Sequence, residues 1–166
     1  MILAGCVRKF GDAIDTDSIL PGRYLSSQDA AFLGSKCMEP IDPDFPRRIA
    51  PGDIIVAGRN FGCGSSREHA VIAIAGAGIA CVVARSYART FFRNAINQGL
   101  PIVVCPEACD IAVEGAPIMV DLARAVVTVG DATFGMEPFP EFLQEIVRLG
   151  GLVPYIRRQL RDPTAR

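Results

Sequence analysis

The segment from Asp53 to Cys105 reads DIIVAGRNFGCGSSREHAVIAIAGAGIACVVARSYARTFFRNAINQGLPIVVC. It contains three continuously apolar runs, which predict strands at 53–57, 79–84 and 101–105. The residues between these runs predict helices at 66–77 and 87–97. Strands that are apolar throughout are typical of a sheet covered on both faces, and helical crossovers make neighbouring strands parallel. We therefore expect an α/β fold with a mostly parallel central sheet and flanking helices.

The flanking sequence adds shorter elements to this centre. Before the central segment we expect an opening strand at 1–9, a polar loop at 11–17, a short helix that starts at Ser26-x-x-Asp29 and ends near Lys36, and a proline-containing loop. After it we expect a hairpin of strands 117–122 and 125–129, followed by helices at 138–149 and 153–160. The tail 160–166 is expected to fray. Because no internal repeat, low-complexity segment or linker interrupts the chain, we expect residues 1–166 to form one domain.

Composition excludes several classes of function. Seventeen basic and eighteen acidic residues among 166 give a net charge of -1 with no block of either sign, which argues against nucleic-acid and membrane-surface binding. The N-terminal apolar stretch is too short for a signal peptide, so we expect a cytoplasmic protein. The six cysteines are expected to be free thiols rather than disulfides, and no CxxC pair indicates a metal site in this chain.

The most informative motif is the run Gly62-Cys-Gly-Ser-Ser-Arg-Glu-His69, which joins a predicted strand to a predicted helix. Its two glycines allow a close approach of the backbone to a ligand. Ser65 and Ser66 are expected in the first turn of the helix, where free N–H groups attract an anion, and Arg67 can grip a carboxylate through two hydrogen bonds. The run therefore predicts a small-anion site. A competing interpretation is that Ser65-x-x-Glu68 is only a capping box, which would stabilise the helix by about 1 kcal/mol.

Other readings of this run fit less well. It has neither the spacing of a P-loop nor that of a Gly-x-Ser-x-Gly nucleophile elbow, and it lacks the third glycine of a dinucleotide-binding fingerprint. His69 is the one histidine of the chain and follows Ser65 by four residues, a spacing that does not give the usual geometry of a serine nucleophile and its base. We expect His69 to have an orienting role at most.

Three segments show a resemblance to a known family. They are FGCGSSREHAVIAIAGAGIACVVARSYARTFFRNAINQGLP at 61–101, DTDSILPGRYL at 15–25 and GGLVPYIRR at 150–158. Together they closely resemble the small subunits of 3-isopropylmalate dehydratase, in the aconitase superfamily. The resemblance implies a swivelling β/β/α domain that closes over a larger iron–sulfur subunit, and a hydro-lyase that is active only with that partner.

The resemblance also implies roles for individual residues. Ser65 would be the catalytic base, acting as an alkoxide, while Ser66, Arg67 and Gly64 would bind a carboxylate of a small 2-hydroxy dicarboxylic acid. Asp17, Thr16 and His69 would form the supporting network. The [4Fe–4S] cluster would belong to the large subunit, with no cofactor held by this chain, in a heterodimer or heterotetramer. Whether the isolated small subunit also self-associates stays open.

The substrate is expected to be read by the loop Ser26-Ser27-Gln28, because the resemblance places the substrate-specificity loop there. This loop has neither the apolar residue of isopropylmalate enzymes nor the arginine of homoaconitases. Small serines leave room for a branched alkyl group, so interconversion of 2-isopropylmalate and 3-isopropylmalate in leucine biosynthesis is the first expectation. The alternatives are a 2,3-dimethylmalate dehydratase, a homoaconitase, a citraconate or citramalate enzyme, and a non-catalytic anion-binding scaffold of the same fold.

Three arginines, Arg85, Arg89 and Arg93, recur at intervals of four residues. This spacing is typical of a solvated helix face, which is the interpretation we favour. A basic stripe toward a partner is the alternative.

Overall fold

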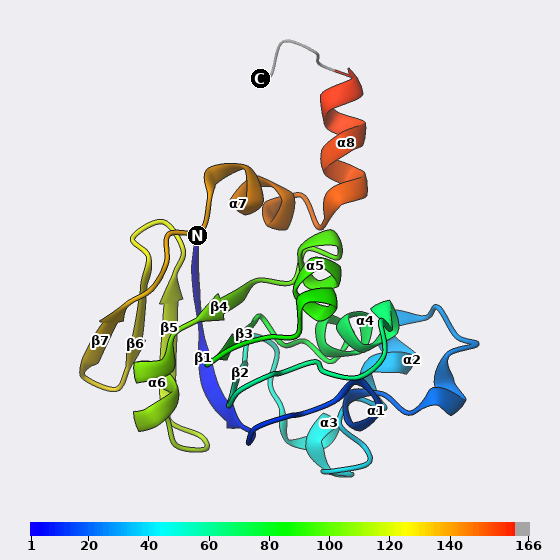
Figure 1. Cartoon of the computed structure of the whole chain (residues 1–166), viewed down its shortest axis with the longest axis horizontal. Helices are drawn as coiled ribbons and strands as arrows, with labels where there is room; N and C mark the ends of the chain where they lie inside the picture. Colours follow the sequence, from blue (N-terminus) through cyan, green and yellow to red (C-terminus); the bar gives the residue numbers. More distant parts are fainter. Residues whose placement is uncertain (162–166) are drawn as a thin grey trace.

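The computed structural model describes residues 1–161 and contains a mixed α/β fold around one seven-stranded sheet (Figure 1). The strand order is β4-β3-β2-β1-β5-β6-β7. The strands are β1 (Ile2–Lys9), β2 (Ile54–Ala57), β3 (Cys81–Ala84), β4 (Ile102–Val104), β5 (Pro117–Asp121), β6 (Val126–Val129) and β7 (Ala132–Gly135). The α-helices are α1 (Thr16–Ile19), α2 (Ala30–Gly34), α3 (Phe45–Arg48), α4 (Glu68–Gly76), α5 (Arg89–Asn97), α6 (Pro106–Ile111), α7 (Glu141–Arg148) and α8 (Leu152–Arg161).

The sheet is half parallel and half antiparallel. Strands β1 to β4 pair in parallel, with Val7 opposite Ile54, whereas β1–β5, β5–β6 and β6–β7 pair antiparallel. The predicted sheet was mostly parallel, whereas the observed sheet has as many antiparallel as parallel strand pairs. The parallel half lies where the sequence predicted it. The hairpin that was predicted after residue 107 is present as β5 and β6, and it pairs with the opening strand.

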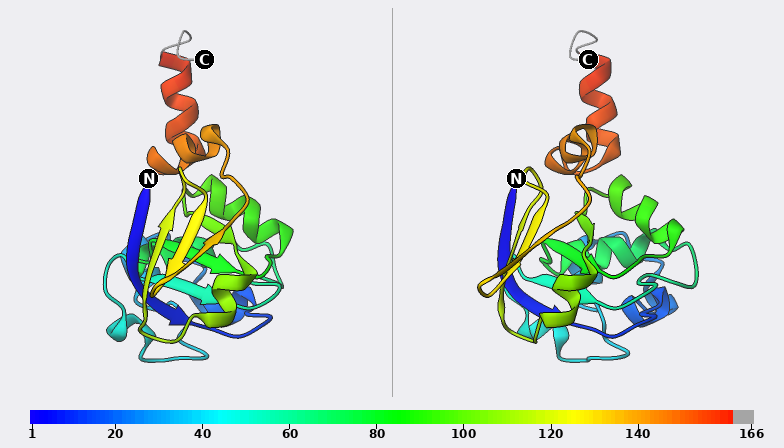
Figure 2. Two further views of the ribbon diagram at one scale, coloured as in Figure 1. Left: turned by 90° about the vertical axis from the view of Figure 1, so that its left-hand side faces the viewer. Right: turned by 60° about the vertical axis from the view of Figure 1, so that its left-hand side comes forward.

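The parallel half forms because its strands are apolar on both faces. Every residue of β2 and β3 is buried. Helix α4 connects β2 to β3 and helix α5 connects β3 to β4, which are the crossovers that parallel neighbours require. Helix α6 contacts β3, β6 and β7, so the sheet curls far enough to bring its two halves against one helix (Figure 2).

Helix α2 packs closely against α4. A Cβ atom built on Gly34 of α2 would collide with the backbone of Gly76 of α4, and one built on Gly76 would collide with the carbonyl group of Ala30. Only glycine at both positions lets the two helices approach this far. This contact fixes α2, and the loop that precedes it, next to the helix that follows the Gly-rich run.

The C-terminal helices lie apart from the sheet. Helix α7 packs near α5, and α8 projects away from the body in all views (Figures 1 and 2). Because α8 continues to Arg161, residues 160 and 161 are helical and the predicted frayed tail is wrong there; 162–166 lie outside the described residues. No helix in the described part of the chain is both long and apolar enough to span a bilayer.

Candidate functional site

Two loops meet where the parallel strands β1 and β2 end. The loop 10–15 runs beside the loop 58–67, and backbone hydrogen bonds join them along their length. These bonds link Gly58 N to Gly11 O (3.0 Å), Ala13 N to Arg59 O (2.8 Å), Gly62 N to Ile14 O (2.8 Å) and Thr16 N to Cys63 O (2.9 Å). Asp12 adds a side-chain bond, since its Oδ1 accepts from Arg59 N at 2.6 Å. The Gly-rich run is therefore held by the polar loop that the sequence predicted at 11–17.

Glycine is required at two positions of the run. Gly62 has φ of +76°, and a Cβ atom there would collide with the buried ring of Phe91. Gly64 has φ of +91°, and a Cβ atom there would lie 3.3 Å from Thr16 Oγ1. Both conformations are costly for other residues. The glycines thus let the chain turn tightly over α5 and leave room beside Thr16.

The side chains of Thr16 and Ser65 meet at the centre of the site. Thr16 Oγ1 lies 3.1 Å from Ser65 Oγ and also donates to the carbonyl oxygen of Ser65 at 3.2 Å. Thr16 is 1% exposed, whereas Ser65 is exposed to solvent. A fixed, buried hydroxyl therefore contacts an accessible one.

Arg67 lies beside these hydroxyl-bearing residues and is held from two sides. Its guanidinium forms an ion pair with the exposed carboxylate of Asp17. It also lies against Gly22, where a Cβ atom would be 3.6 Å from Arg67 Nη2. The structure thus brings Thr16, Asp17, Ser65 and Arg67 together, as the resemblance implies.

The helix start differs from the prediction. Helix α4 begins at Glu68, and its N-cap residue Arg67 makes no side-chain capping bond. Glu68 does not reach back to Ser65; its Oε1 atom accepts a hydrogen bond from Gln98 Nε2 at 2.7 Å. The capping-box interpretation is therefore wrong, and so is the placement of Ser65 and Ser66 in the first helical turn. Both serines precede the helix in an irregular segment.

Helix α5 supports this segment through residues that sequence analysis missed. Asn94 Nδ2 donates to the carbonyl oxygen of Ser66 at 3.3 Å, and Gln98 contacts Glu68 as described. Asn94 and Gln98 are four residues apart and so lie on one face of α5. The spacing of these two amide side chains was the one sign in the sequence that they could act together. Nothing in the sequence identifies the residues that they contact.

The loop 26–28 reaches the site only through Gln28. Gln28 Nε2 lies 2.9 Å from His69 Nε2, which joins the loop to α4. Ser27 Oγ accepts from the backbone N–H of Asp29 at 3.2 Å. Within residues 1–161, no hydrogen bond joins Ser26 or Ser27 to Ser65, Ser66 or Arg67. The helix predicted to start at Ser26 begins at Ala30, with Asp29 as its N-cap.

The cysteines are free throughout the described chain. Burial raises the pKa of Cys37 and of Cys81 well above that of an ordinary thiol, so both stay protonated at neutral pH. Among residues 1–161, no group of three or more His, Cys, Asp and Glu side chains is arranged to hold a metal ion. An iron–sulfur cluster therefore does not fit the donor groups of this part of the chain.

Comparison with known proteins identifies the family. Residues 36–107 match the model of the aconitase C-terminal domain. The 3-isopropylmalate dehydratase small subunit of Caldicellulosiruptor saccharolyticus is 49% identical over 163 residues, which cover 97% of this chain and 94% of that protein. The chain belongs to the 3-isopropylmalate dehydratase small-subunit family. Small subunit 1 of the same enzyme from Methanopyrus kandleri is 52% identical over 160 residues, covering 95% of this chain and 94% of that protein.

A solved structure supports the same family at the level of the fold. The crystal structure of 3-isopropylmalate dehydratase from Methanocaldococcus jannaschii superimposes with a TM-score of 0.92 at 43% identity, covering 99% of this chain and 98% of that chain. The domain model begins after Asp17, so it includes Ser65 and Arg67 but not the loop that holds them. Matches to the full-length small subunits extend the family assignment to both halves of the site.

Proposed function

We propose that this chain is the small subunit of a heteromeric hydro-lyase that interconverts 2-isopropylmalate and 3-isopropylmalate in leucine biosynthesis. The observation that carries the proposal is the contact of the exposed Ser65 hydroxyl with the buried Thr16 hydroxyl, on a segment that also carries Arg67, whose guanidinium group pairs with the neighbouring Asp17. A base and an anion-binding group lie together on a chain that is similar to 3-isopropylmalate dehydratase small subunits over nearly its whole length.

In this proposal Ser65, as an alkoxide, removes the proton from the carbon next to a substrate carboxylate. The electron pair of that C–H bond forms the double bond while hydroxide leaves from the adjacent carbon, and readdition of water at the other carbon gives the isomer. Thr16 Oγ1, at 3.1 Å, is placed to donate a hydrogen bond to the alkoxide. A charge-assisted bond of this kind lowers the cost of deprotonating serine.

Arg67 would bind the substrate carboxylate. A guanidinium offers two parallel N–H donors to a carboxylate, and Arg67 already pairs with the carboxylate of Asp17. Asp17 is 65% exposed in its side chain and Arg67 24%, so the pair lies at the mouth of the site rather than beneath it. Substrate would share or replace the Asp17 contact, and Ser66 and Gly64 would line the same mouth.

The site would be completed by a large subunit. The similar proteins are named small subunits, and the family resemblance assigns the [4Fe–4S] cluster to the large one. When bound there, the cluster would supply a Lewis-acidic iron that assists loss of hydroxide. The exposed Ser65 and the partly exposed Arg67, at the ends of β1 and β2, are consistent with one half of a closed site. The chain would move as one swivelling domain in the cytoplasm.

Substrate selection would depend on the loop 26–28. Its two serines leave space for an alkyl branch and provide no cation for a third carboxylate, which favours isopropylmalate over a tricarboxylate. The Gln28–His69 contact would hold the loop against α4.

The experiment is to reconstitute the complex with its large subunit under anaerobic conditions. Isopropylmalate, 2,3-dimethylmalate, homocitrate and citraconate are then assayed in parallel. The proposal predicts the highest kcat/KM with isopropylmalate. A higher value with homocitrate would contradict the substrate assignment, and the absence of turnover with all four would favour the non-catalytic scaffold.

A further inference from the structure

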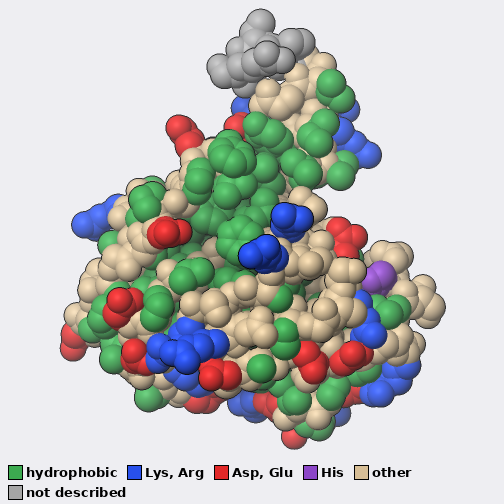
Figure 3. Space-filling view, in the orientation of Figure 1, with side chains coloured by type: hydrophobic (Ala, Val, Ile, Leu, Met, Phe, Trp, Pro, Cys, Tyr) green, Lys and Arg blue, Asp and Glu red, His purple; other side chains and the backbone are tan. Residues whose placement is uncertain are grey.

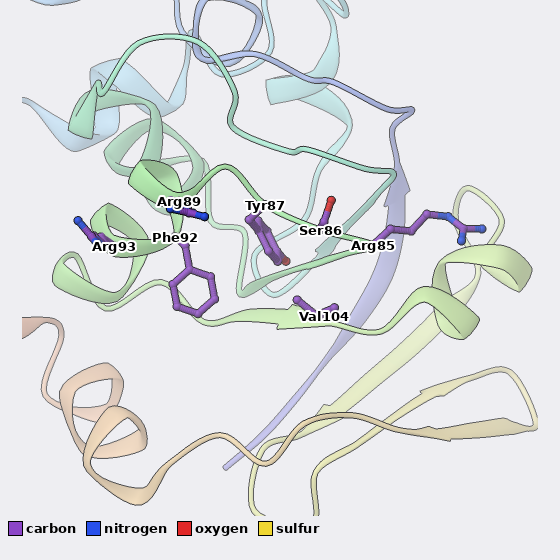
Figure 4. A pocket seen from close by; sticks show the side chains of 7 residues that line it. All are labelled: Arg85, Ser86, Tyr87, Arg89, Phe92, Arg93 and Val104. Carbon is purple, nitrogen blue, oxygen red and sulfur yellow. The ribbon is translucent and has the colours of Figure 1, made fainter.

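A pocket of about 320 Å³ lies next to the site on helix α5 (Figure 4). It is lined by the segment that links β3 to α5, by the first turns of α5 and by the end of β4. A second pocket, of about 100 Å³, shares Phe92 and Val104 with the first and continues to Phe139 and Leu143 beside α7. The two form one groove, which we call the α5 groove. Figure 3 shows hydrophobic side chains gathered between α5 and α7, with basic side chains over α5 at the margin.

The floor of the α5 groove is apolar and fixed. The Tyr87 hydroxyl lies within hydrogen-bond distance of the carbonyl oxygens of Val82 (2.7 Å) and Val103 (2.9 Å), and donation to one of them anchors the ring beneath the pocket. Burial raises the pKa of Tyr87 well above its usual value, so the ring remains neutral. Phe92 points into the groove, and Val104 is 40% exposed on the edge strand β4 (Figure 4). The groove therefore offers a preformed, solvent-accessible apolar surface.

The margin of the groove carries unpaired positive charge. Arg89 and Arg93 are exposed on α5, and within residues 1–161 no carboxylate lies within 4.0 Å of either guanidinium. Arg85 differs from both: it lies before the helix, points away toward α6 and pairs with Asp110 (Figure 4). The three arginines thus do not form one solvated helix face, because the two on α5 flank an apolar groove and the third has its own partner.

The α5 groove is linked to the site through helix α5 and the segment that enters it. Phe61, in the Gly-rich loop, accepts a hydrogen bond from Ala88 N (3.0 Å) and donates to Ser86 O (3.0 Å), at the entrance to α5. Asn94, next to Arg93, contacts Ser66. The site loop and the groove therefore share one edge of the sheet and one helix. A partner protein that covers Ser65 and Arg67 would therefore also extend over α5.

We infer that the α5 groove receives a segment of the large subunit in which an apolar side chain is flanked by carboxylates. The inference rests on the proposed function, which requires the large subunit to close over this edge. The apolar side chain would displace water from Phe92 and Val104, and the carboxylates would pair with Arg89 and Arg93. Such pairing sets orientation and association rate as well as affinity.

The test is the affinity of the small subunit for the large subunit. The double variant Arg89→Glu/Arg93→Glu is compared with the matched control Arg47→Glu/Arg124→Glu, which changes the same charge on α3 and on the β5–β6 turn. All four side chains are exposed, so neither variant removes core packing, and circular dichroism verifies the fold. We expect the Arg89→Glu/Arg93→Glu variant to raise the Kd of assembly by about tenfold or more. The Kd of this variant should also depend less on salt than that of wild type, and the Kd of the control should stay near the wild-type value.

Equal Kd values for the two variants would overturn the groove assignment while leaving the proposed function intact, provided that wild type assembles and turns over isopropylmalate. Failure of wild type to bind the large subunit would contradict both. Sedimentation of the isolated small subunit is measured as well. If the Arg89→Glu/Arg93→Glu change altered self-association instead of binding to the large subunit, a second copy of this chain would be the occupant and the inference would be wrong.

Discussion

Thr16 Oγ1 lies 3.1 Å from Ser65 Oγ across 49 residues of sequence. Thr16 opens helix α1 directly after the loop that follows β1, and Ser65 lies in the loop that follows β2. The contact therefore depends on these strands being parallel neighbours that end at one edge. The buried threonine cannot turn away to solvent, since its backbone N–H is bound to Cys63 O at 2.9 Å. The geometry gives the Ser65 hydroxyl a fixed hydrogen-bond partner, which can act as a donor only once Ser65 is an alkoxide.

Replacing Thr16 by Val should lower the kcat of the reconstituted complex. The substitution keeps the shape but removes the hydroxyl, and loss of a hydrogen bond to a charged group costs about 1.5–3 kcal/mol, or roughly tenfold or more in rate. Thr16→Ser, which retains the hydroxyl, should keep most of the activity. Steady-state kinetics with isopropylmalate measures both; equal activity of the Val and Ser variants would refute the role given to this contact.

Replacing Arg67 by Lys should raise KM more than it lowers kcat. Lysine keeps the charge but cannot form two parallel hydrogen bonds to one carboxylate, so we expect KM to rise by about tenfold. Arg59→Lys in the same loop is the matched control, because its side chain is exposed and outside the contact with Asp17. An unchanged KM in Arg67→Lys would show that the substrate carboxylate is bound elsewhere.

The sequence predicted the parallel half of the fold better than the antiparallel half. Continuous apolar runs identify β2 and β3, which are buried throughout, and β4, which is buried except for Val104. Strand β7 (Ala132–Gly135) alternates half-buried and exposed residues and was missed. The opening strand was predicted correctly. Its pairing with β5, more than 100 residues away, carries no local signal.

The sequence supplied candidate residues for the site but not their geometry, and the roles given to these residues stay predictions. The Gly-rich run indicated an anion site, and family resemblance added Thr16 and Asp17. The expected capping box failed because Glu68 has a better-placed donor in Gln98, which the sequence places 30 residues away. Helix α6, only six residues long and opening with Pro106, was missed because one and a half turns show no clear periodicity.

Replacing Asp53 by Asn should destabilise the fold and weaken its acid sensitivity. Asp53 is 2% exposed; burial alone would raise its pKa, but hydrogen bonds from the backbone N–H groups of Ala50 and Cys6 and from Arg8 outweigh burial and lower it. A lowered pKa gives stability that is present above the unfolded-state value of about 4 and is lost as pH falls through the folded-state value.

We therefore expect Asp53→Asn to lose about 3 kcal/mol near neutral pH, because the largely buried Arg8 loses its buried carboxylate partner and keeps only the more exposed Glu114. Below about pH 4 the difference from wild type should shrink. Urea unfolding of the small subunit across this pH range measures both effects, with the exposed Asp44→Asn as control. A loss of stability that stayed constant from pH 7 to pH 3 would contradict the pKa argument.

Breaking the Gln28–His69 contact should raise KM with little change in kcat. The 2.9 Å contact is the hydrogen bond that holds the loop 26–28 against α4. Its loss would make this loop more mobile but would not move a reacting group, so KM should change more than kcat. Gln28→Ala and His69→Leu should each raise KM by about threefold to tenfold, as expected for one hydrogen bond of about 1 kcal/mol. The double variant should be no worse than either single variant, and Gln159→Ala on α8 is the control. Additive effects would show that the two side chains act separately.

The central claim is that Ser65 is the base of a hydro-lyase completed by a large subunit. The most direct measurement is turnover of isopropylmalate by the anaerobically reconstituted complex carrying Ser65→Ala, together with the Kd of its assembly. Since Ser65 is exposed and does not cap α4, the substitution should leave folding and assembly unchanged. We expect loss of turnover with an unchanged Kd; turnover near the wild-type rate would show that Ser65 is not the base.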